Sequence, residues 1–255
     1  MEGLFDSLKG KRVLITGSSR GIGKALAAGF AENQANVAIH GIKKCENSDK
    51  TIAELSRYGT KIVGVYGDLS DPKTPGKLVA DTVKELGGID ILICNASVQI
   101  RNQWLEITDE EMQFQTQVNF FNTIKLIQSA VPYMLENGWG RIITIGSTQQ
   151  EKPHPEMLIY SATKCAVRNA VQSIALQLAD KNITVNNVSV GVVNTDRNSE
   201  VLKNEEYYNT VKNRNPVKFI GEPEDCVSSV LMLASKSGRY ITGDNIHVDG
   251  GRNIS

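Results

Sequence analysis

Short apolar runs alternate with longer amphipathic segments along the whole chain. Continuous apolar strands separated by helices are typical of a parallel sheet that helices cover on both faces. The pattern therefore predicts a three-layer, doubly wound α/β fold with a seven-stranded parallel sheet, in which ligands bind at the carboxyl ends of the strands. The expected strands cover residues 12–16, 37–39, 61–65, 89–93, 141–145, 183–188 and 245–248.

The first apolar run leads directly into a glycine-rich turn and then into an alanine-rich segment. Its glycines are Gly17, Gly21 and Gly23, which gives the spacing Gly-x-x-x-Gly-x-Gly. Glycine permits positive φ and close approach of the backbone, and the free N–H groups at the start of a helix attract a pyrophosphate. A tight strand-to-helix turn could explain a lone glycine cluster, but the preceding strand and the position near the chain start favour nucleotide binding.

A candidate acid/base pair follows the fifth apolar run. Tyr160 and Lys164 lie one helical turn apart, and Ser147 closes the apolar run before them. On one helix face, an ammonium group would favour the ionised form of the phenol. At ~4 Å and an effective dielectric of ~20 the attraction is worth about 4 kcal/mol, enough to move a phenol pKa of ~10 toward neutrality. A lone Tyr-x-x-x-Lys is more often a surface pair, so the rest of the chain must decide.

Taken together, these motifs resemble the classical branch of the short-chain dehydrogenase/reductase family over nearly the whole chain. Further family motifs occur in the expected order: Asp68-Leu69, Asn95-Ala96, Asn119, and Gly191 with Thr195. Ser97 and Val190 depart from the usual Asn-Ala-Gly and Pro-Gly, so the geometry of those two loops stays open. The resemblance implies a Rossmann-like fold in which residues 1–255 form a single NAD(P)-binding domain.

The resemblance also implies roles for individual residues. Tyr160 would exchange a proton with the substrate oxygen, Lys164 would lower the pKa of Tyr160 and bind the nicotinamide ribose, and Ser147 would hydrogen-bond the substrate oxygen. Asn119 would satisfy a helix kink and hold a water linked to the lysine, while Asn95 would brace the sheet more than it touches the chemistry. Expected catalytic residues are Asn119, Ser147, Tyr160 and Lys164; expected coenzyme contacts are Gly17, Ser19, Arg20, Gly21, Ile22, Gly23, Lys43, Asp68, Leu69, Asn95, Ala96, Tyr160, Lys164, Val193 and Thr195.

The segment after the second strand bears on which coenzyme is used. A carboxylate there would accept hydrogen bonds from a ribose 2′-hydroxyl and repel a 2′-phosphate. The chain has no acid there, and instead Lys43 and Lys44 follow. Arg20 stands where similar NADP-dependent members place an arginine, and both residue types can neutralise a phosphate. NADP(H) is therefore favoured, although exposed lysines are as often simply solvated and NAD(H) stays possible.

Polar residues follow the fourth, fifth and sixth strands, where the substrate is expected. They suit a sugar, polyol or keto acid. A 3-ketoacyl-carrier-protein reductase is the enzymatic alternative and would need a basic docking patch. A nucleotide-sensing protein without turnover is disfavoured because all four catalytic residues are present. The polar positions are Ser97, Gln99, Gln149, Gln150, His154, Glu156, Asn194 and Arg197, and the expected substrate contacts are Ser147, Gln149, His154, Tyr160 and Arg197.

The balance of charged residues bears on which kinds of partner the protein binds. Lysine plus arginine equals aspartate plus glutamate, 28 each, so no net field recruits nucleic acid or a membrane surface. No apolar run approaches the ~20 residues of a membrane span, and the first residues carry acid where a secretion signal needs base, which predicts a cytoplasmic protein. The 4 cysteines and 3 histidines are scattered, and no metal site is expected.

Two further segments carry predictions. The polar stretch 198–215 is expected to form either a mobile lid over the substrate cleft, as in the family, or a solvated helix. In the helix that carries Tyr160, Val167, Val171, Ile174 and Leu178 form an apolar row, and small residues at 162, 166, 170 and 173 form a second row. The second row permits close approach of another helix, and similar enzymes use this helix and the one containing Asn119 to form a homodimer or homotetramer. Packing within one chain is the alternative explanation of the second row.

Overall fold

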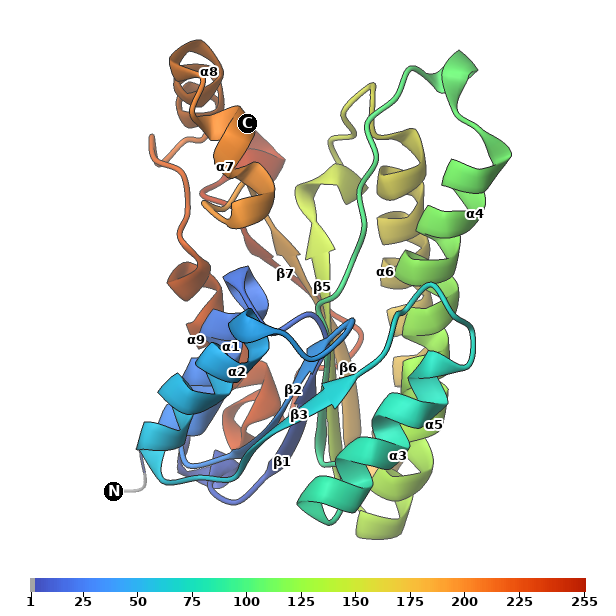
Figure 1. Cartoon of the computed structure of the whole chain (residues 1–255), viewed down its shortest axis with the longest axis vertical. Coiled ribbons are helices and arrows are strands. Elements are labelled where there is room, and N and C mark those ends of the chain that lie inside the picture. The colour runs from blue at the N-terminus through green and yellow to red at the C-terminus, as the bar shows by residue number, and fades with distance from the viewer. Residues whose placement is uncertain (1–2) are drawn as a thin grey trace.

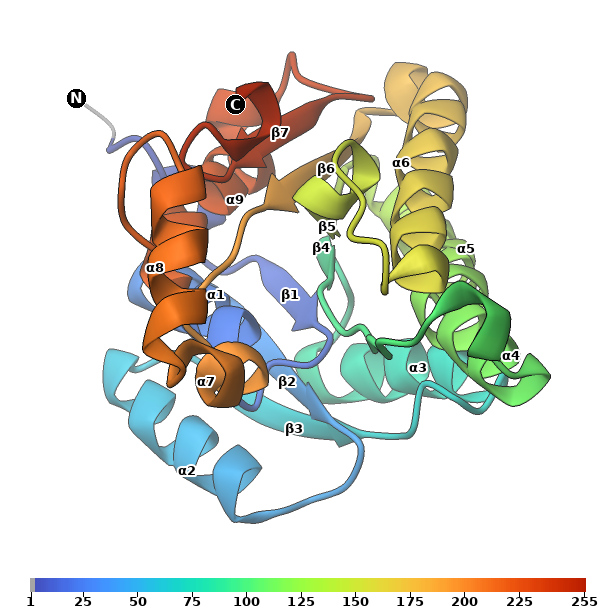
Figure 2. The ribbon, with the colours of Figure 1, turned by 90° about the horizontal axis from the view of Figure 1, so that it is seen from above.

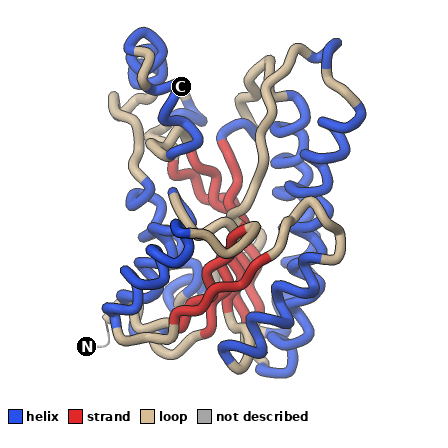
Figure 3. The backbone as a smooth tube through the Cα atoms, viewed as in Figure 1, coloured by secondary structure: helices blue, strands red, loops and turns tan. Residues whose placement is uncertain are grey.

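The computed structural model of the chain describes residues 3–255, apart from the side chain of Glu200. Seven parallel strands form one sheet in the order β3-β2-β1-β4-β5-β6-β7, which confirms the predicted fold class. Figure 3 shows these strands as the central layer. The strands are β1 (Arg12–Ile15), β2 (Asn36–Gly41), β3 (Ile62–Tyr66), β4 (Ile91–Cys94), β5 (Gly140–Ser147), β6 (Ile183–Val190) and β7 (Asn245–Val248).

Helices cover both faces of the sheet (Figure 1). On one face lie α1 (Gly21–Glu32), α2 (Glu46–Leu55) and α9 (Val227–Ala234). The other face carries α3 (Thr74–Leu86), α5 (Asn122–Asn137) and α6 (Leu158–Leu178), with α4 (Asp109–Thr116) leading into α5. The remaining pair, α7 (Asp196–Leu202) and α8 (Glu205–Arg214), stands beyond the carboxyl ends of the strands. The structure therefore has the predicted three layers.

Two hydrophobic clusters fill the spaces between the layers. Leu26 and Phe30 of α1 pack with Val230 of α9 on one side of the sheet. Leu126 of α5 and Val171 of α6 belong to the cluster on the other side. Strands β1 and β4 lie at the centre of the sheet and are apolar apart from Arg12, which explains why the sequence pattern located them.

The strand order reverses between β1 and β4, and this reversal positions the site. Chain segments leave the two strands toward opposite faces, so the carboxyl ends of neighbouring strands can hold a ligand between them. Figure 2, viewed from above, shows α7 and α8 on one side of these ends and the start of α6 on the other. Val190, one of the two departures from the family pattern, pairs regularly with Val248 and leaves the end of β6 undistorted.

Candidate active site

A cavity of about 740 Å³ opens at the carboxyl ends of the strands. Every predicted coenzyme contact lines it, from the glycine turn to Thr195. The predicted substrate contacts Ser147, Gln149, His154 and Arg197 line the same cavity. One predicted catalytic residue, Asn119, does not belong to its wall.

The glycine turn is shaped by close backbone contacts. Gly17 and Gly21 have φ values of +64° and +56°, which favour glycine. A Cβ on Gly23 would collide with the Gly17 carbonyl oxygen and lie 2.7 Å from the Asn95 side-chain nitrogen. The Asn95 amide donates to the carbonyls of Thr16 and Gly17 at 2.9 and 3.0 Å. Asn95 therefore braces the turn against β1, and this open turn at the start of α1 fits a pyrophosphate.

His40 supports the same turn, a role that sequence reasoning missed. Its Nδ1 accepts a hydrogen bond from the Gly17 N–H at 2.9 Å, and its Nε2 lies 3.0 Å from the Gly67 carbonyl oxygen. These contacts require the neutral tautomer with the proton on Nε2. Burial lowers the pKa of His40 and keeps it in that form. A polar residue at the end of β2, beside the glycine turn, was the only available signal.

Tyr160 and Lys164 are both buried in the wall of the cavity. The Lys164 Nζ lies 5.6 Å from the centre of the Tyr160 ring. It donates a hydrogen bond to the Ile145 carbonyl oxygen at 2.7 Å. Burial, together with the positive charge of Arg197, lowers the pKa of Lys164 to about 7. The two side chains thus share a site, as the sequence predicted.

The electrostatics of Tyr160 differ from the expectation. Burial raises the pKa of its phenol, while the Arg197 charge and hydrogen bonds with Ser147 and Ser97 oppose that rise. Arg197, rather than Lys164, is therefore the cation that lowers the pKa of the phenol here. The physical reason is that burial also discourages the charged form of Lys164, whose ammonium was the expected source of stabilisation.

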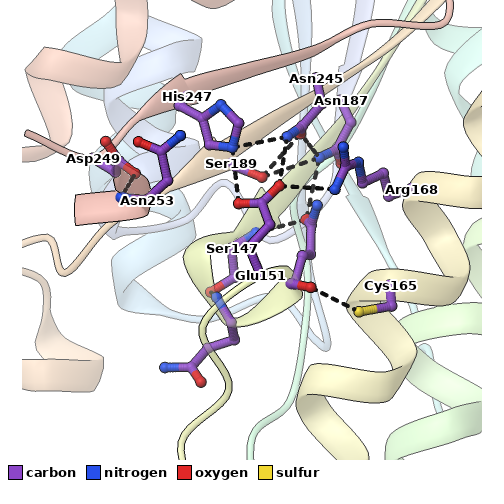
Figure 4. A network of polar contacts seen from close by, with 12 residues as sticks. Ser147, Glu151, Cys165, Arg168, Asn187, Ser189, Asn245, His247, Asp249 and Asn253 are labelled. Carbon is purple, nitrogen blue, oxygen red and sulfur yellow. Dashed lines mark hydrogen bonds and ion pairs between the residues drawn. The ribbon is translucent and has the colours of Figure 1, made fainter. Parts of the chain in front are cut away.

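Ser147 is the last residue of β5 and is fixed by a buried polar network (Figure 4). Its N–H donates to the Gln150 side-chain oxygen at 3.0 Å, and the same oxygen accepts from Asn187 at 3.2 Å. Farther out, Glu151 binds Arg168 at 2.8 Å and His247 at 2.9 Å. Gln150 was expected among the substrate-facing polar residues, but it lies behind Ser147 and supports its backbone.

Asn119 occupies a π-helical turn, Gln117–Phe121, between α4 and α5. Its side chain accepts from the Val98 N–H and donates to the Val98 carbonyl oxygen, each at 2.9 Å. A third hydrogen bond joins it to Thr163 Oγ1 at 3.2 Å. The expected helix irregularity is present, but the side chain serves the loop after β4 and the helix of Tyr160. Asn119 therefore lies outside the cavity and holds two of the segments that form it, the loop at Val98 and the helix of Tyr160.

The remaining sequence expectations separate into residues inside and outside the cavity. Lys43 lines it, whereas Lys44 lies outside and faces Asp49 at 3.9 Å. Arg20 lies 3.7 Å from Asp196, and both side chains are largely exposed. Of the polar substrate-facing residues, Glu156 and Asn194 fall outside the wall, because loop side chains there turn to other partners: Asn194, for example, binds Glu222 at 3.1 Å.

Asp68 lines the cavity and also shapes its own loop. Its carboxylate accepts a hydrogen bond from the Ser70 N–H at 2.8 Å, so it caps the turn before α3. The carboxylate belongs to the end of the cavity near His40. The negative charge of Asp68 favours the protonated form of that histidine. This position fits a contact with the coenzyme's adenosine end.

Helices α7 and α8 fill the segment for which the sequence suggested a lid or a solvated helix. Tyr207, Val211 and Arg214 line the cavity from this side. Arg101, from the loop after β4, donates to the Tyr207 hydroxyl at 3.3 Å across it. The sequence did not single out Arg101, Tyr207 or Arg214, because nothing in the local pattern shows that distant loops converge.

Residues 3–255 contain neither a metal-binding cluster nor a membrane-spanning helix. That range contains no group of three or more histidine, cysteine, aspartate or glutamate side chains that could hold a metal ion. None of its helices combines the length and apolar character needed to cross a bilayer.

Comparisons with known proteins place this architecture. A family model described as enoyl-(acyl carrier protein) reductase matches residues 17–253. A glucose 1-dehydrogenase of Gluconobacter oxydans is 38% identical over 251 residues, which cover 96% of this chain and 93% of that protein. Human dehydrogenase/reductase SDR family member 4 is 31% identical over 247 residues, covering 96% of this chain and 88% of the relative. The chain belongs to the short-chain dehydrogenase/reductase family.

A solved structure extends the comparison to the coenzyme. A 3-oxoacyl-(acyl-carrier-protein) reductase from Agrobacterium tumefaciens C58 with NADP bound matches at a TM-score of 0.93 and 34% identity. The match covers 98% of this chain and 97% of that chain. As a member of this family, the chain is an NAD(P)-dependent oxidoreductase that acts on CH–OH groups.

Proposed function

We propose that this dehydrogenase/reductase transfers a hydride between NADP(H) and a small polar carbonyl or secondary alcohol of the sugar, polyol or keto acid type. The observation that carries the proposal is the cavity itself, where the buried Tyr160 phenol and Lys164 amine share one space with the glycine turn. The G. oxydans relative, named as a glucose dehydrogenase, supports a polyhydroxylated substrate.

The chain's own residues would manage the proton that accompanies the hydride. The nicotinamide supplies or accepts the hydride at the substrate carbon. The Tyr160 phenol donates a proton to the substrate oxygen in reduction and takes it back in oxidation. Ser147 Oγ hydrogen-bonds that oxygen, a contact worth ~3 kcal/mol where the oxygen bears negative charge. Lys164 holds the coenzyme ribose and, when charged, favours the tyrosinate.

A single-atom variant tests the role of Tyr160. We expect Tyr160→Phe to bind NADPH like the wild type, because the ring remains, and to lose at least ~100-fold in kcat, the usual contribution of a general acid or base. Tyr133→Phe is the matched control, since Tyr133 lies in α5 away from the cavity. NADPH fluorescence and steady-state turnover report the two properties. Unchanged turnover in Tyr160→Phe would contradict the assignment.

The NADP(H) preference rests on the cations at the adenosine end of the cavity. Lys43 lines the cavity and Lys44, its neighbour, does not. We expect Lys43→Gln to weaken NADPH binding about tenfold through the loss of a charge-assisted contact. NADH binding should not change, and Lys44→Gln should affect neither coenzyme. Tighter binding of NADH than of NADPH by the wild type would overturn the preference.

Reduction of a 3-oxoacyl group on a carrier protein is the second candidate. The Agrobacterium structure with that name supports it. Rates with acetoacetyl-carrier protein and with keto sugars, measured side by side through NADPH absorbance, separate the two candidates. A preference for the carrier-bound substrate would replace the sugar-type assignment.

We also propose a homodimer or homotetramer, in the cytoplasm, formed partly through α6. Along this helix the small residues are accessible: Ala162 and Ser173 are exposed, and Ala166 and Ala170 are half-buried. Phe121, next to α5, is 50% exposed. Light scattering should show an oligomer that Ala166→Arg dissociates, because a long charged side chain prevents close helix contact. A monomeric wild type would contradict the assembly, and cell fractionation checks the location.

A further inference from the structure

The substrate end of the cavity is lined by cations. Arginines and a lysine approach it from five separate segments, although the net charge of the whole chain is zero. Among the side chains that the structure describes, the carboxylates on the wall are Asp68 and Asp196, which lie at the coenzyme end near His40 and Arg20. Besides Arg20, Lys43 and Lys164, the cations on the wall are Arg101, Lys152, Arg197, Arg214 and Arg252.

Arg197 is a wall cation whose charge acts on both Tyr160 and Lys164. Its Nη1 donates to Ser97 Oγ at 3.1 Å and its Nη2 donates to the Ser97 carbonyl oxygen at 2.6 Å. Its charge lowers the pKa of both Tyr160 and Lys164. No described carboxylate forms an ion pair with it. Arg197 therefore faces the cavity beside the phenol with N–H donors still available after the two contacts to Ser97.

Ser97 gives this arginine a fixed place. In the family pattern a glycine usually stands at this position, and a glycine would supply the carbonyl contact but no hydroxyl. Here the hydroxyl accepts from Arg197 at 3.1 Å, and the influence of Ser97 lowers the pKa of the Tyr160 phenol. Ser97 thus ties the guanidinium to the acid/base residue, and one departure from the family pattern has a structural role in the site.

We propose that the substrate is an anion, namely a small hydroxy or oxo carboxylic acid whose carboxylate binds Arg197, with Ser97 as the positioning residue of that arginine. The inference rests on the proposed function and narrows its substrate class. A planar guanidinium matches a carboxylate in geometry and charge. A neutral sugar would leave Arg197 without a counter-charge, because no described carboxylate forms an ion pair with it.

The test uses the full-length enzyme and matched pairs of substrates. Each pair consists of an acid and the alcohol with CH₂OH in place of the carboxylate: lactate with 1,2-propanediol, glycerate with glycerol, and D-gluconate with D-glucitol. We expect kcat/KM with NADP⁺ to favour the acid by at least ~10-fold in the best pair. Arg197→Gln should lower the acid-to-alcohol ratio by ~10- to 100-fold, the usual effect of losing a charged hydrogen bond. Arg239→Gln, an exposed arginine outside the cavity, should leave the ratio unchanged.

Ser97 is tested in the same assay. We expect Ser97→Gly to lower the acid-to-alcohol ratio by about 3- to 10-fold, because a carbonyl contact remains while the hydroxyl contact is lost. Calorimetry adds a readout independent of turnover: NADPH-loaded enzyme should bind D-gluconate more tightly than D-glucitol, and Arg197→Gln should abolish the difference.

The other possible outcomes each contradict the carboxylate inference or replace it. Equal rates and equal binding within every pair, or no turnover of any acid, would overturn the inference. A preference for D-glucitol 6-phosphate over D-gluconate would replace the carboxylate with a phosphate, and a preference for acetoacetyl-carrier protein would replace the small acid. If the alcohols react and Tyr160→Phe still abolishes turnover, the hydride-transfer assignment survives the loss of this inference. Turnover that ignores Tyr160→Phe would instead remove the proposed function.

Discussion

The buried amine of Lys164 has a measurable effect on folding stability. Burial lowers its pKa from 10.5 to about 7, so between these two values the unfolded chain holds a proton that the folded chain does not. At about 1.4 kcal/mol per pKa unit, burial disfavours the charged amine by ~4 to 5 kcal/mol. Because the folded pKa is the lower one, folding stability rises with pH across this window. The full cost is present below pH 7 and vanishes above pH 10.5.

Lys164→Met removes the titrating group and keeps most of its length. We expect the variant to be more stable than the wild type by ~1 to 3 kcal/mol at pH 7. This gain is smaller than the ~4 to 5 kcal/mol cost of the charged amine, because the variant also loses the hydrogen bond to the Ile145 carbonyl, which is worth ~1 to 3 kcal/mol. By the same linkage, the difference should shrink by ~2 kcal/mol between pH 7 and pH 9. Catalysis should be lost in the same protein.

Urea unfolding without added coenzyme, at one protein concentration and both pH values, measures this difference directly. Other titrating groups contribute equally to both proteins and cancel. Lys236→Met is the control, because Lys236 is exposed on the surface, and its difference from the wild type should not change with pH. A stability difference between Lys164→Met and the wild type that stays constant or widens with pH would refute a depressed lysine pKa.

Three other predictions follow from the coenzyme side of the site. NADPH binding at pH 7 should take up protons, because the phosphate charge of the coenzyme raises the pKa of Lys164. Calorimetry in two buffers of different ionisation enthalpy detects the proton uptake, and Lys164→Met should abolish that uptake. Gly23→Ala should weaken NADPH binding at least ~10-fold and destabilise the fold by ~1 to 3 kcal/mol, because its Cβ meets the Gly17 carbonyl. Gly76→Ala in α3 should do neither, because its Cβ would meet only Ser129 Oγ at 3.9 Å, an ordinary contact; fluorescence titration and urea unfolding measure both effects. His40, whose folded pKa lies below 6.5, should make stability fall as pH drops below 6.5, and His40→Gln should flatten that slope in acid unfolding.

The fold and the central site could be predicted because their signals are local. Apolar runs mark strands that are buried on both faces, and each catalytic motif follows such a strand or lies on one helix face. Tyr160 and Lys164 share a face because of helix geometry alone. Ser147 ends β5, so its position relative to that helix follows from the parallel sheet.

The rest could not be predicted because it depends on contacts between distant segments. Lys43 and Lys44 are neighbours with the same chemistry, and only the folded loop turns one to the cavity and the other to Asp49. The contact of Arg101 with Tyr207 joins residues 106 positions apart. Asn119 was correctly placed in an irregular helix, but no pattern could show that its amide is used on the Val98 backbone.

The raised pKa of the Tyr160 phenol and the lowered pKa of the Lys164 amine have the same cause, and one bound anion would act against both. Both charged forms are disfavoured by burial, and the nearby Arg197 adds repulsion for the ammonium. An anion bound beside Lys164 would favour its charged form, and the charged amine would then stabilise the tyrosinate, the effect that the sequence predicted. The acid/base pair is therefore expected to work only with coenzyme present. Such an arrangement favours binding of the coenzyme before the substrate, so product inhibition by the oxidised and reduced coenzymes should be competitive with each other and not with the substrate.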